Sequence, residues 1–295
     1  MMLTVDNFLD YLRYERGRSD LTVMSYGKDL HAFEQFFKSK DTGISWETVD
    51  ADVIRDWMES MMDCGNKASS VDRRLSAVRS FYRYALVHKM IDNDPSHGVV
   101  GPKKEKPLPQ FLKESEMDSL LDGDRWSTLY KEVLARTIIM TFYETGIRVS
   151  ELVGLGDVDV DFATGEMKVT GKRDKQRVIP FGKELARTLK DYRAQRNHDV
   201  EIHSNRFFLS QKGQALNIKQ VSYMVRKYLT AACTLKKRTP HVLRHTFATA
   251  MLNNHADLES VKKLLGHESL STTEIYTHTT FEQLKRVYTN AHPRA

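Results

Sequence analysis

A proline-rich, polar stretch divides this chain of 295 residues into two parts. Four of its seven prolines fall within fifteen residues: Pro95, Pro102, Pro107 and Pro109. Proline fixes its own φ and lacks the N–H that a helix interior needs, so the segment 101–109, GPKKEKPLP, is unable to continue a helix. We therefore predict a linker at 101–110, between an N-terminal domain at 1–100 and a second domain at 111–295.

The first part has the hydrophobic periodicity of four amphipathic helices. Apolar residues recur at helical spacing near residues 5–12, 23–37, 54–61 and 71–85. We expect Asp50 to cap the third helix, and Ser69 or Ser70 to cap the fourth. Four such helices with short polar connections predict a small helical domain.

The second part mixes helical and strand patterns. Glu166–Thr170 and Gln176–Pro180 flank a Gly-Lys-Arg-Asp-Lys turn and predict a β-hairpin, and Phe207–Leu209 suggests a further short strand. Helices are expected at 114–122, 130–145, 182–196, 217–230, 240–252, 257–265 and 270–288. The predicted fold is mainly α, with a small β-sheet in the second domain.

Charge is distributed unevenly between the two parts. Residues 1–109 carry 16 Lys and Arg against 17 Asp and Glu, a net of −1, whereas residues 110–295 carry 29 against 22, a net of +7. Ile202–Ala256 holds nine basic residues and no acidic one. Such a stretch suits a surface that lies along nucleic acid, but a solvated basic face explains it equally well. Arg73, Arg79 and Arg83 fall on one flank of the fourth helix, and this flank could likewise either face nucleic acid or only be solvated.

Composition excludes several other classes. No run of 18 apolar residues occurs, so no transmembrane helix and no membrane partner are predicted. The start of the chain lacks a basic segment followed by an apolar one, so we expect no signal peptide and a cytoplasmic protein. The only cysteines, Cys64 and Cys233, have no metal-ligand spacing and exclude a disulfide scaffold.

The segment 239–252, TPHVLRHTFATAML, combines helix-start signals with basic residues. Thr239 suits the N-cap and Pro240 the first helical position, so His241 and Arg244 share one face near a helix N-terminus, where anions are favoured. We expect His245 to point elsewhere. A His-x-x-Arg pair is by itself more often structural. His241 and His245 are spaced as in some metal sites, but they lack the intervening Glu and a third ligand, so no metal is predicted.

Two glycine-marked segments carry further candidates. In ETGIRVSELVGL, 144–155, Gly146 ends a helix and places Arg148 in the turn. Ser150 is expected to cap a short helix, and Glu151 lies near enough to support a guanidinium. The predicted hairpin tip holds Lys172, Arg173 and Lys175, which alone indicate only turn chemistry.

In LLGHESLSTTEIYTH, 264–278, Gly266 ends a helix, His267 follows it, and Tyr276 lies on the next helix. A tyrosine there is either part of the core or a nucleophile. A free phenol has a pKa near ~10, so attack on phosphate requires a base and surrounding positive charge.

Taken in order and with these gaps, the motifs resemble the tyrosine recombinases of the phage-integrase family, and among them the Xer type of bacterial chromosome-dimer recombinase. The resemblance covers essentially the whole chain. It includes the helical N-terminal domain, the proline-rich linker, TGIRVSELVGL, the GK hairpin, HVLRHTFAT, LLGH, STTEIYTH and the terminal HPRA.

The resemblance implies a catalytic set. Arg148 and Arg244 match the arginines that hold the scissile phosphate, with Glu151 as the supporting carboxylate. Tyr276 matches the nucleophile and His241 the group that assists its deprotonation. His267 matches a phosphate hydrogen-bond donor, and Lys172 the general acid for the leaving 5′ oxygen.

The resemblance also implies the reaction and its partners. Tyr276 would form a 3′-phosphotyrosyl bond with DNA, without metal, ATP or another cofactor, and four protomers would exchange strands through a Holliday junction. Two domains would close on duplex DNA as a C-shaped clamp, with Arg73, Arg79, Arg83, Arg173 and Lys175 facing it. A second related recombinase and a cell-division DNA translocase are implied partners. The segment 281–295 would dock into a neighbouring protomer through Val287 and Tyr288.

Three alternatives remain open from the sequence. An integrase or transposon recombinase shares the chemistry but has another biological role. A type IB topoisomerase uses similar residues on one strand as a monomer, so recombination between two duplexes distinguishes it. A non-catalytic DNA-binding protein on the same scaffold would have no need of Tyr276.

Overall fold

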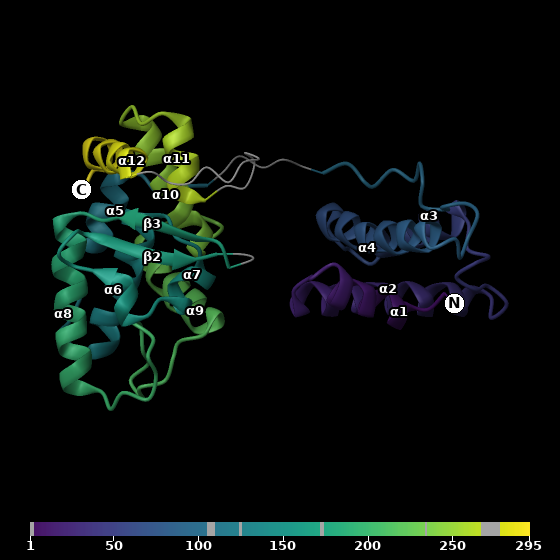
Figure 1. The fold of residues 1–295 in the computed structure, drawn as a ribbon, viewed down its shortest axis with the longest axis horizontal. Coiled ribbons are helices and arrows are strands. Elements are labelled where there is room, and N and C mark those ends of the chain that lie inside the picture. Colours follow the sequence, from purple (N-terminus) through teal and green to yellow (C-terminus); the bar gives the residue numbers. More distant parts are fainter. Residues whose placement is uncertain (1–2, 105–109, 124–125, 172–173, 234, 267–277) are drawn as a thin grey trace. The chain divides into compact units, whose positions relative to one another are not determined.

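The computed structural model describes residues 3–104, 110–123, 126–171, 174–233, 235–266 and 278–295. The chain forms two compact units, Met1–Pro107 and Leu108–Ala295. The second unit contains a three-stranded antiparallel sheet, and helices make up most of the rest of both units (Figure 1). The prediction of a mainly α fold with a small sheet is confirmed.

The described residues of the first unit, 3–104, form four α-helices: α1 (Val5–Asp10), α2 (Asp20–Lys40), α3 (Ala51–Asp63) and α4 (Ala68–Val87), with a π-helical turn, η1 (Tyr11–Glu15), after α1. Asp50 caps α3 as predicted, accepting from the backbone N–H groups of Asp52 and Val53 at 2.9 Å each. The predicted serine cap of α4 is wrong, because Lys67 occupies the N-cap and both serines lie inside the helix.

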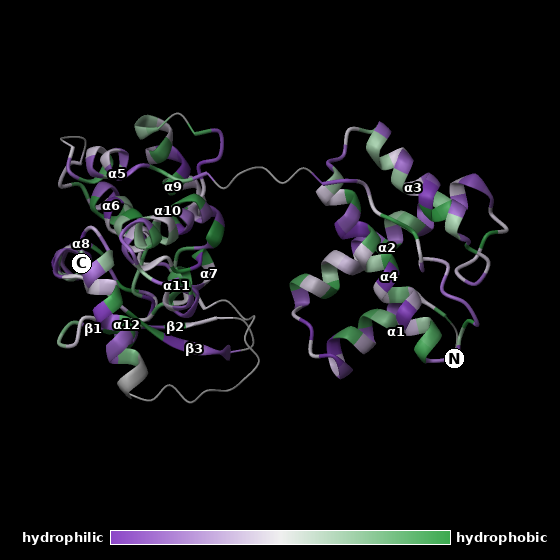
Figure 2. Ribbon diagram, turned by 90° about the horizontal axis from the view of Figure 1, so that it is seen from above, coloured by the Kyte–Doolittle hydropathy of each residue, from purple (hydrophilic) through white to green (hydrophobic). Residues whose placement is uncertain are grey.

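Hydropathy alternates along these helices, as Figure 2 shows, and their apolar sides meet in one aromatic core. Trp46 lies in the α2–α3 connection. The centroid of its ring is 4.4 Å from that of Phe81 and 5.2 Å from that of Phe37. The buried Tyr82 hydroxyl donates to the Trp46 carbonyl at 3.0 Å, so this hydroxyl is not left without a hydrogen-bond partner in the core.

The second unit is built from α5 to α12 and the sheet. The elements are α5 (Glu114–Leu121), α6 (Tyr130–Thr145), α7 (Val149–Gly154), η2 (Asp157–Asp159), β1 (Val160–Asp161), β2 (Glu166–Thr170), β3 (Gln176–Pro180), α8 (Lys183–Asp199), α9 (Ile218–Ala232), α10 (Pro240–Asn253), α11 (Leu258–Leu265) and α12 (His278–Ala291). The sheet order is β1-β2-β3, with Met167 opposite Ile179 and Val169 opposite Arg177.

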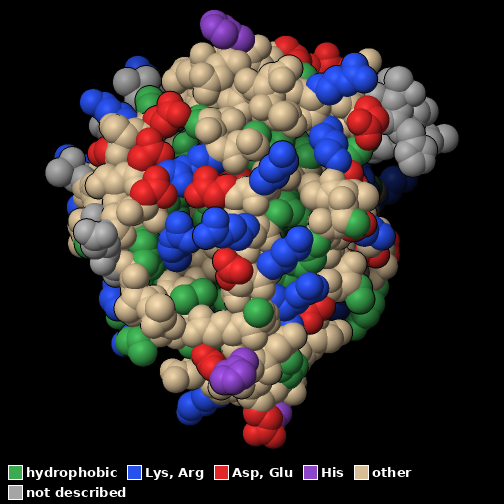
Figure 3. Space-filling view, turned by 90° about the vertical axis from the view of Figure 1, so that its left-hand side faces the viewer, with side chains coloured by type: hydrophobic (Ala, Val, Ile, Leu, Met, Phe, Trp, Pro, Cys, Tyr) green, Lys and Arg blue, Asp and Glu red, His purple; other side chains and the backbone are tan. Residues whose placement is uncertain are grey.

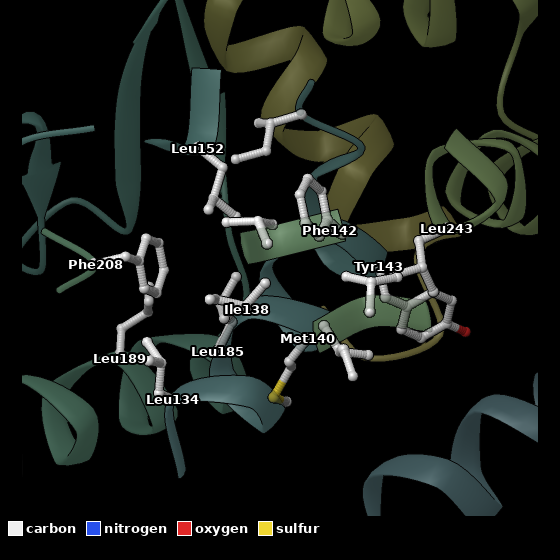
Figure 4. Packing of buried hydrophobic residues seen from close by; sticks show 14 of the residues in the cluster. Leu134, Ile138, Met140, Phe142, Tyr143, Leu152, Leu185, Leu189, Phe208 and Leu243 are labelled. Atoms are coloured by element: carbon white, nitrogen blue, oxygen red, sulfur yellow. The ribbon is translucent and has the colours of Figure 1, made fainter. Parts of the chain in front are cut away.

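Helix α6 is the centre of the second unit and contacts α8, α9 and α10. Leu134 and Ile138 of α6 face Leu185 and Leu189 of α8 and the ring of Phe208 (Figure 4). The buried threonines of α6 satisfy their hydroxyls locally, since Thr141 donates to the Thr137 carbonyl at 2.7 Å. Such a buried helix holds its C-terminal end, where Gly146 lies, in a defined position.

The predicted hairpin strands are confirmed, but the strand expected at Phe207–Leu209 is not. Instead, isolated bridges join Gly156 to Arg206 and Leu209 to Ala215. The segment is apolar because Phe207 and Phe208 are core residues, which explains why it resembled a buried strand.

The C-terminal helix packs on its own chain. Leu284, Tyr288 and Ala291 of α12 are buried against Phe247 and other residues of α10 and α11. The Tyr288 hydroxyl donates to Glu144 at 3.3 Å and accepts from the Gly182 N–H at 3.2 Å. Tyr288 is thus buried within its own chain and Val287 is only partly buried, while docking of 281–295 into a neighbouring protomer stays a prediction.

Candidate active site

The turn after α6 places Arg148. Gly146 ends α6 with φ of +59°, and a Cβ there would lie 2.5 Å from Phe247 Cδ1, so this position requires glycine. Arg148 follows at the N-cap of α7 with 31% of its side chain exposed. The predicted Ser150 cap is wrong: the Glu151 carboxylate accepts from the Arg148 backbone N–H at 2.7 Å and so takes the capping role.

Glu151 is a fully buried carboxylate held between two arginines. Its Oε1 accepts from Arg148 Nη1 at 2.8 Å, the contact that the sequence predicted. It also accepts from Arg177 Nη1 at 2.6 Å, and Oε2 accepts from Arg177 Nη2 at 2.9 Å. Burial alone would raise the pKa of Glu151, but the two guanidiniums outweigh burial and lower it. Glu151 therefore stays ionised and can orient Arg148.

Arg177 is the site residue that the sequence reasoning missed. Its side chain is only 8% exposed, on the same face of β3 as the buried Ile179. Alternation along QRVIP would have shown an arginine on the inner face of a half-buried strand, and such a charge requires a partner. The partner itself, Glu151, is 26 residues away in sequence and becomes identifiable only in the fold.

Arg244 lies on α10, whose N-cap Thr239 and first residue Pro240 are as predicted. It is buried, and it donates to the carbonyls of Gly146 and Leu265 at 2.7 Å each. Burial, followed by the nearby charges of Arg148 and Arg177, lowers the pKa of Arg244 to about 10. Arg244 is thus still a cation at neutral pH.

Three arginines share the C-terminal end of α11, which Gly266 terminates with φ of +66°. The carbonyls of Leu264, Leu265 and Gly266 accept from Arg177 Nε at 3.0 Å, Arg244 Nη2 at 2.7 Å and Arg148 Nη2 at 2.8 Å, respectively. Final helix carbonyls lack intrahelical partners and carry partial negative charge, so they hold guanidiniums well. Among the described residues, Glu151 is the one carboxylate in this cluster, bound by Arg148 and Arg177, so these three arginines keep a net positive charge that favours an anion beside them.

His241 is exposed at the start of α10, three residues before the buried Arg244. His245, which we expected to point elsewhere, is exposed as well. The part of the His245 ring that the protein covers is the main cause that lowers its pKa, and the charges of His241 and Arg244 lower it further. Among the described residues, no group of three His, Cys, Asp or Glu is arranged to hold a metal ion.

Four predicted site residues lie outside the described residues: Lys172, Arg173, His267 and Tyr276. The structure therefore brings together Arg148, Glu151 and Arg244 from the predicted catalytic set. Lys175, on the described side of the hairpin tip, is exposed, and its backbone carbonyl accepts from the Gly171 N–H at 2.8 Å.

Comparison with known proteins identifies the family. The sequence matches the Phage integrase family over residues 110–283 and the Phage integrase, N-terminal SAM-like domain over residues 5–89. Tyrosine recombinase XerC of Pelotomaculum thermopropionicum is 39% identical, across 100% of this chain and 99% of the relative. Tyrosine recombinase XerD of Oceanobacillus iheyensis is 36% identical, across 99% and 98%.

The chain belongs to the Xer-type tyrosine recombinases of the phage integrase family. It is therefore a site-specific DNA recombinase. Solved structures share the fold of this recombinase. XerH bound to palindromic difH substrate has a TM-score of 0.70 at 23% identity, covering 96% of this chain and 83% of that one. The Tn1549 transposon integrase in complex with transposon right end DNA has a TM-score of 0.74 at 19% identity, covering 97% and 98%.

The arginines of the first unit that were expected to face DNA differ in their surroundings. Arg73 forms a bidentate pair with the buried Asp29, with Nη2 2.9 Å from Oδ1, and Arg79 donates to the Val99 carbonyl. Arg83 is exposed. Arg73 is exposed as well, over 49% of its side chain, but Asp29 binds its guanidinium.

In the view of Figure 3, basic and acidic side chains of the recombinase are interspersed. A DNA-binding surface needs segregated positive charge, so this view gives no sign of one. Among the described residues, no helix is sufficiently long and apolar to span a membrane.

Proposed function

We propose that this recombinase cuts and rejoins DNA through a covalent phosphotyrosyl intermediate. The observation that supports this is the cluster of Arg148, Arg177 and Arg244 around one buried carboxylate and one helix end. In this proposal Arg148 and Arg244, pre-organised by protein acceptors, direct their remaining donors at a phosphate, and they need not reorganise as its charge grows in the transition state.

In the proposed first step, the Tyr276 hydroxyl oxygen attacks the scissile phosphorus. A 3′-phosphotyrosyl bond forms, and the bond between phosphorus and the 5′ oxygen breaks. His241 assists removal of the phenol proton, Lys172 donates a proton to the leaving 5′ oxygen, and His267 donates a hydrogen bond to the phosphate. Arg148 and Arg244 bind non-bridging oxygens.

In the second step, a 5′ hydroxyl from another duplex attacks the phosphotyrosyl bond and releases Tyr276. The phosphodiester energy is retained in the intermediate, so the proposed sequence consumes no ATP. Two such exchanges would pass through a Holliday junction, and four protomers on two DNA sites would perform them.

We further propose that the cellular task is resolution of chromosome dimers in the cytoplasm. Identities of 39% and 36% to XerC and XerD relatives, across 100% and 99% of this chain, support this role over that of an integrase. A second related recombinase and a cell-division DNA translocase are the proposed partners. The first unit would act as a core-binding domain and close on the duplex together with the second unit.

The test is covalent capture on a suicide substrate, in which a nick removes the nucleophile needed for resealing. Wild type should yield a protein–DNA adduct on a denaturing gel, and Tyr276→Phe should bind the same DNA without forming one. An adduct that persists in Tyr276→Phe would refute the assigned nucleophile. Binding without an adduct by wild type, even with a second Xer recombinase added, would refute the proposed chemistry.

A further inference from the structure

Arg177 joins three elements that surround Arg148. From β3, its guanidinium forms a bidentate pair with Glu151 of α7, and its Nε donates to the Leu264 carbonyl of α11 at 3.0 Å. These three hydrogen bonds exceed what charge neutralisation requires, because a single ion pair would neutralise the Arg177 charge. The arrangement instead fixes relative positions of the hairpin, α7 and α11.

Arg148 and Arg177 use the same acceptor atom. Glu151 Oε1 lies 2.8 Å from Arg148 Nη1 and 2.6 Å from Arg177 Nη1. The two remaining carboxylate contacts, from Arg177 Nη2 and the Arg148 backbone N–H, prevent the carboxylate from rotating. The direction in which Arg148 points therefore depends on where Arg177 holds Glu151.

We infer that Arg177 is a positioning residue that sets the orientation of the Arg148 guanidinium toward the scissile phosphate. The inference rests on the proposed function. Arg177 is not expected to touch DNA, because its side chain is nearly buried and its fork already has protein acceptors. It acts through Glu151.

The position of Arg177 in the chain gives this role a second consequence. β3 is one strand of the hairpin whose tip carries Lys172, and α11 ends at Gly266, directly before His267. A Cβ at Gly266 would lie 3.1 Å from the Arg177 side chain, so the fit between the two is close. The Arg177 guanidinium thus joins β3, α7 and α11. These are the elements on which, or next to which in sequence, the three proposed site residues Arg148, Lys172 and His267 lie.

The experiment compares Arg177→Met and Arg177→Lys with wild type in the full-length protein. Arg187→Gln is the matched control, because Arg187 is an arginine of the same unit with 86% of its side chain exposed. We expect the rate of adduct formation on the suicide substrate to fall on the order of 10- to 100-fold in Arg177→Met, with an unchanged dissociation constant for DNA. Arg177→Lys keeps the charge but not the fork and should recover only part of the rate.

A substrate with a methylphosphonate at the scissile position separates positioning from general damage. This group lacks the negative charge that Arg148 offsets, so the ratio of wild-type to Arg177→Met rates should shrink on it. The inference would be overturned if the ratio of wild-type to Arg177→Met rates were the same on the methylphosphonate and the phosphate substrate. A wild-type rate of adduct formation in both Arg177 variants would overturn it as well. If Arg177→Met does not fold, as judged by circular dichroism, the same comparison with Arg177→Lys decides. Failure of wild type to form any adduct would instead count against the proposed function.

Discussion

Arg148 and Arg244 donate to consecutive backbone carbonyls, those of Gly266 and Leu265, at distances of 2.8 and 2.7 Å. The two arginines lie 96 positions apart in sequence (244 − 148), yet one helix end sets the spacing of their guanidiniums. Because α11 presents these carbonyls in fixed order, any change that displaces its last turn should move both arginines together. We therefore expect the proposed active site to be sensitive to substitutions in the last turn of α11.

The buried Glu151 gives the most direct expectation. In Glu151→Gln the carboxylate charge is lost, and Arg177 keeps a buried charge without its counter-ion. We expect the free energy of unfolding to fall by about 3 kcal/mol and adduct formation to slow at least tenfold, roughly, with DNA affinity retained. Urea denaturation and covalent capture measure the two effects. A wild-type cleavage rate in this variant would show that the carboxylate is dispensable for Arg148.

Gly146 is expected to tolerate no side chain. In Gly146→Ala the new Cβ would meet Phe247 Cδ1 at 2.5 Å and Leu265 Cδ2 at 2.8 Å, at a positive φ. Its carbonyl, which accepts from Arg244, must then shift. We expect a loss of about 1 to 3 kcal/mol in stability and a slower adduct rate. Gly154→Ala is the control, because nothing lies within 4 Å of a Cβ there. Similar effects of the two substitutions would contradict this explanation.

Arg73 and Arg83 should respond differently to alanine. Arg73→Ala removes the bidentate partner of Asp29, whose side chain is 5% exposed, so the first unit should lose about 1 to 3 kcal/mol of stability. Arg83→Ala should leave stability unchanged. If Arg83 contacts one phosphate, the logarithm of the DNA association constant should fall less steeply with the logarithm of salt concentration in Arg83→Ala than in wild type, by about 0.9 in slope. DNA titrations over a range of salt test this, and an unchanged slope would remove Arg83 from the DNA-contact set.

His292 should make the docking of the C-terminal segment sensitive to acid. Its Nδ1 accepts from the Arg294 N–H at 3.2 Å, so Nε2 carries the proton and donates to the Tyr143 carbonyl at 3.2 Å. Burial, and then the charge of Arg294, lower the pKa of His292 to about 4, although the Tyr143 bond opposes this. Between pH 6.5 and 4 the unfolded chain therefore binds more protons at His292 than the folded protein does. The free energy of unfolding consequently decreases as the pH is lowered through this interval.

The size of that effect follows from the two pKa values. A decrease from 6.5 to about 4 corresponds to a loss of about 3 kcal/mol as pH falls through that interval. In His292→Phe this part of the pH dependence should disappear, although stability at pH 8 should be lower because two hydrogen bonds are lost. Thermal unfolding from pH 8 to 4 gives the difference curve. Parallel curves for variant and wild type would contradict the prediction.

Glu144 should have the opposite dependence. It is fully buried, its Oε1 has no hydrogen-bond partner within the described part of the chain, and burial, with Glu184 nearby, raises its pKa well above the ordinary value. Because the folded state holds the proton more tightly, this stabilisation is complete below pH 4.5 and is lost as pH rises. Glu144→Gln should therefore raise the melting temperature most at high pH and least at low pH, as calorimetry would show. An effect independent of pH would indicate that Glu144 does not titrate on unfolding.

Local sequence determined most of the secondary structure. Apolar periodicity located the helices of both units, and turn chemistry located the hairpin, because these signals act between residues a few positions apart. The errors occurred where a nearby side chain competed. Arg148 took the N-cap of α7 in place of Ser150, with Glu151 accepting from its backbone N–H, and the aromatic residues Phe207 and Phe208 packed in the core rather than in a strand.

Local sequence also predicted the contact between Arg148 and Glu151, since three residues separate them. Only the tertiary structure decided the rest of the site. The pairing of Arg177 with Glu151, the three carbonyls of α11 and the docking of Tyr288 on its own unit all join residues far apart in the chain. Burial of a charge or a hydroxyl requires a partner, but which distant group supplies it depends on how helices and strands pack, and no local pattern contains that information.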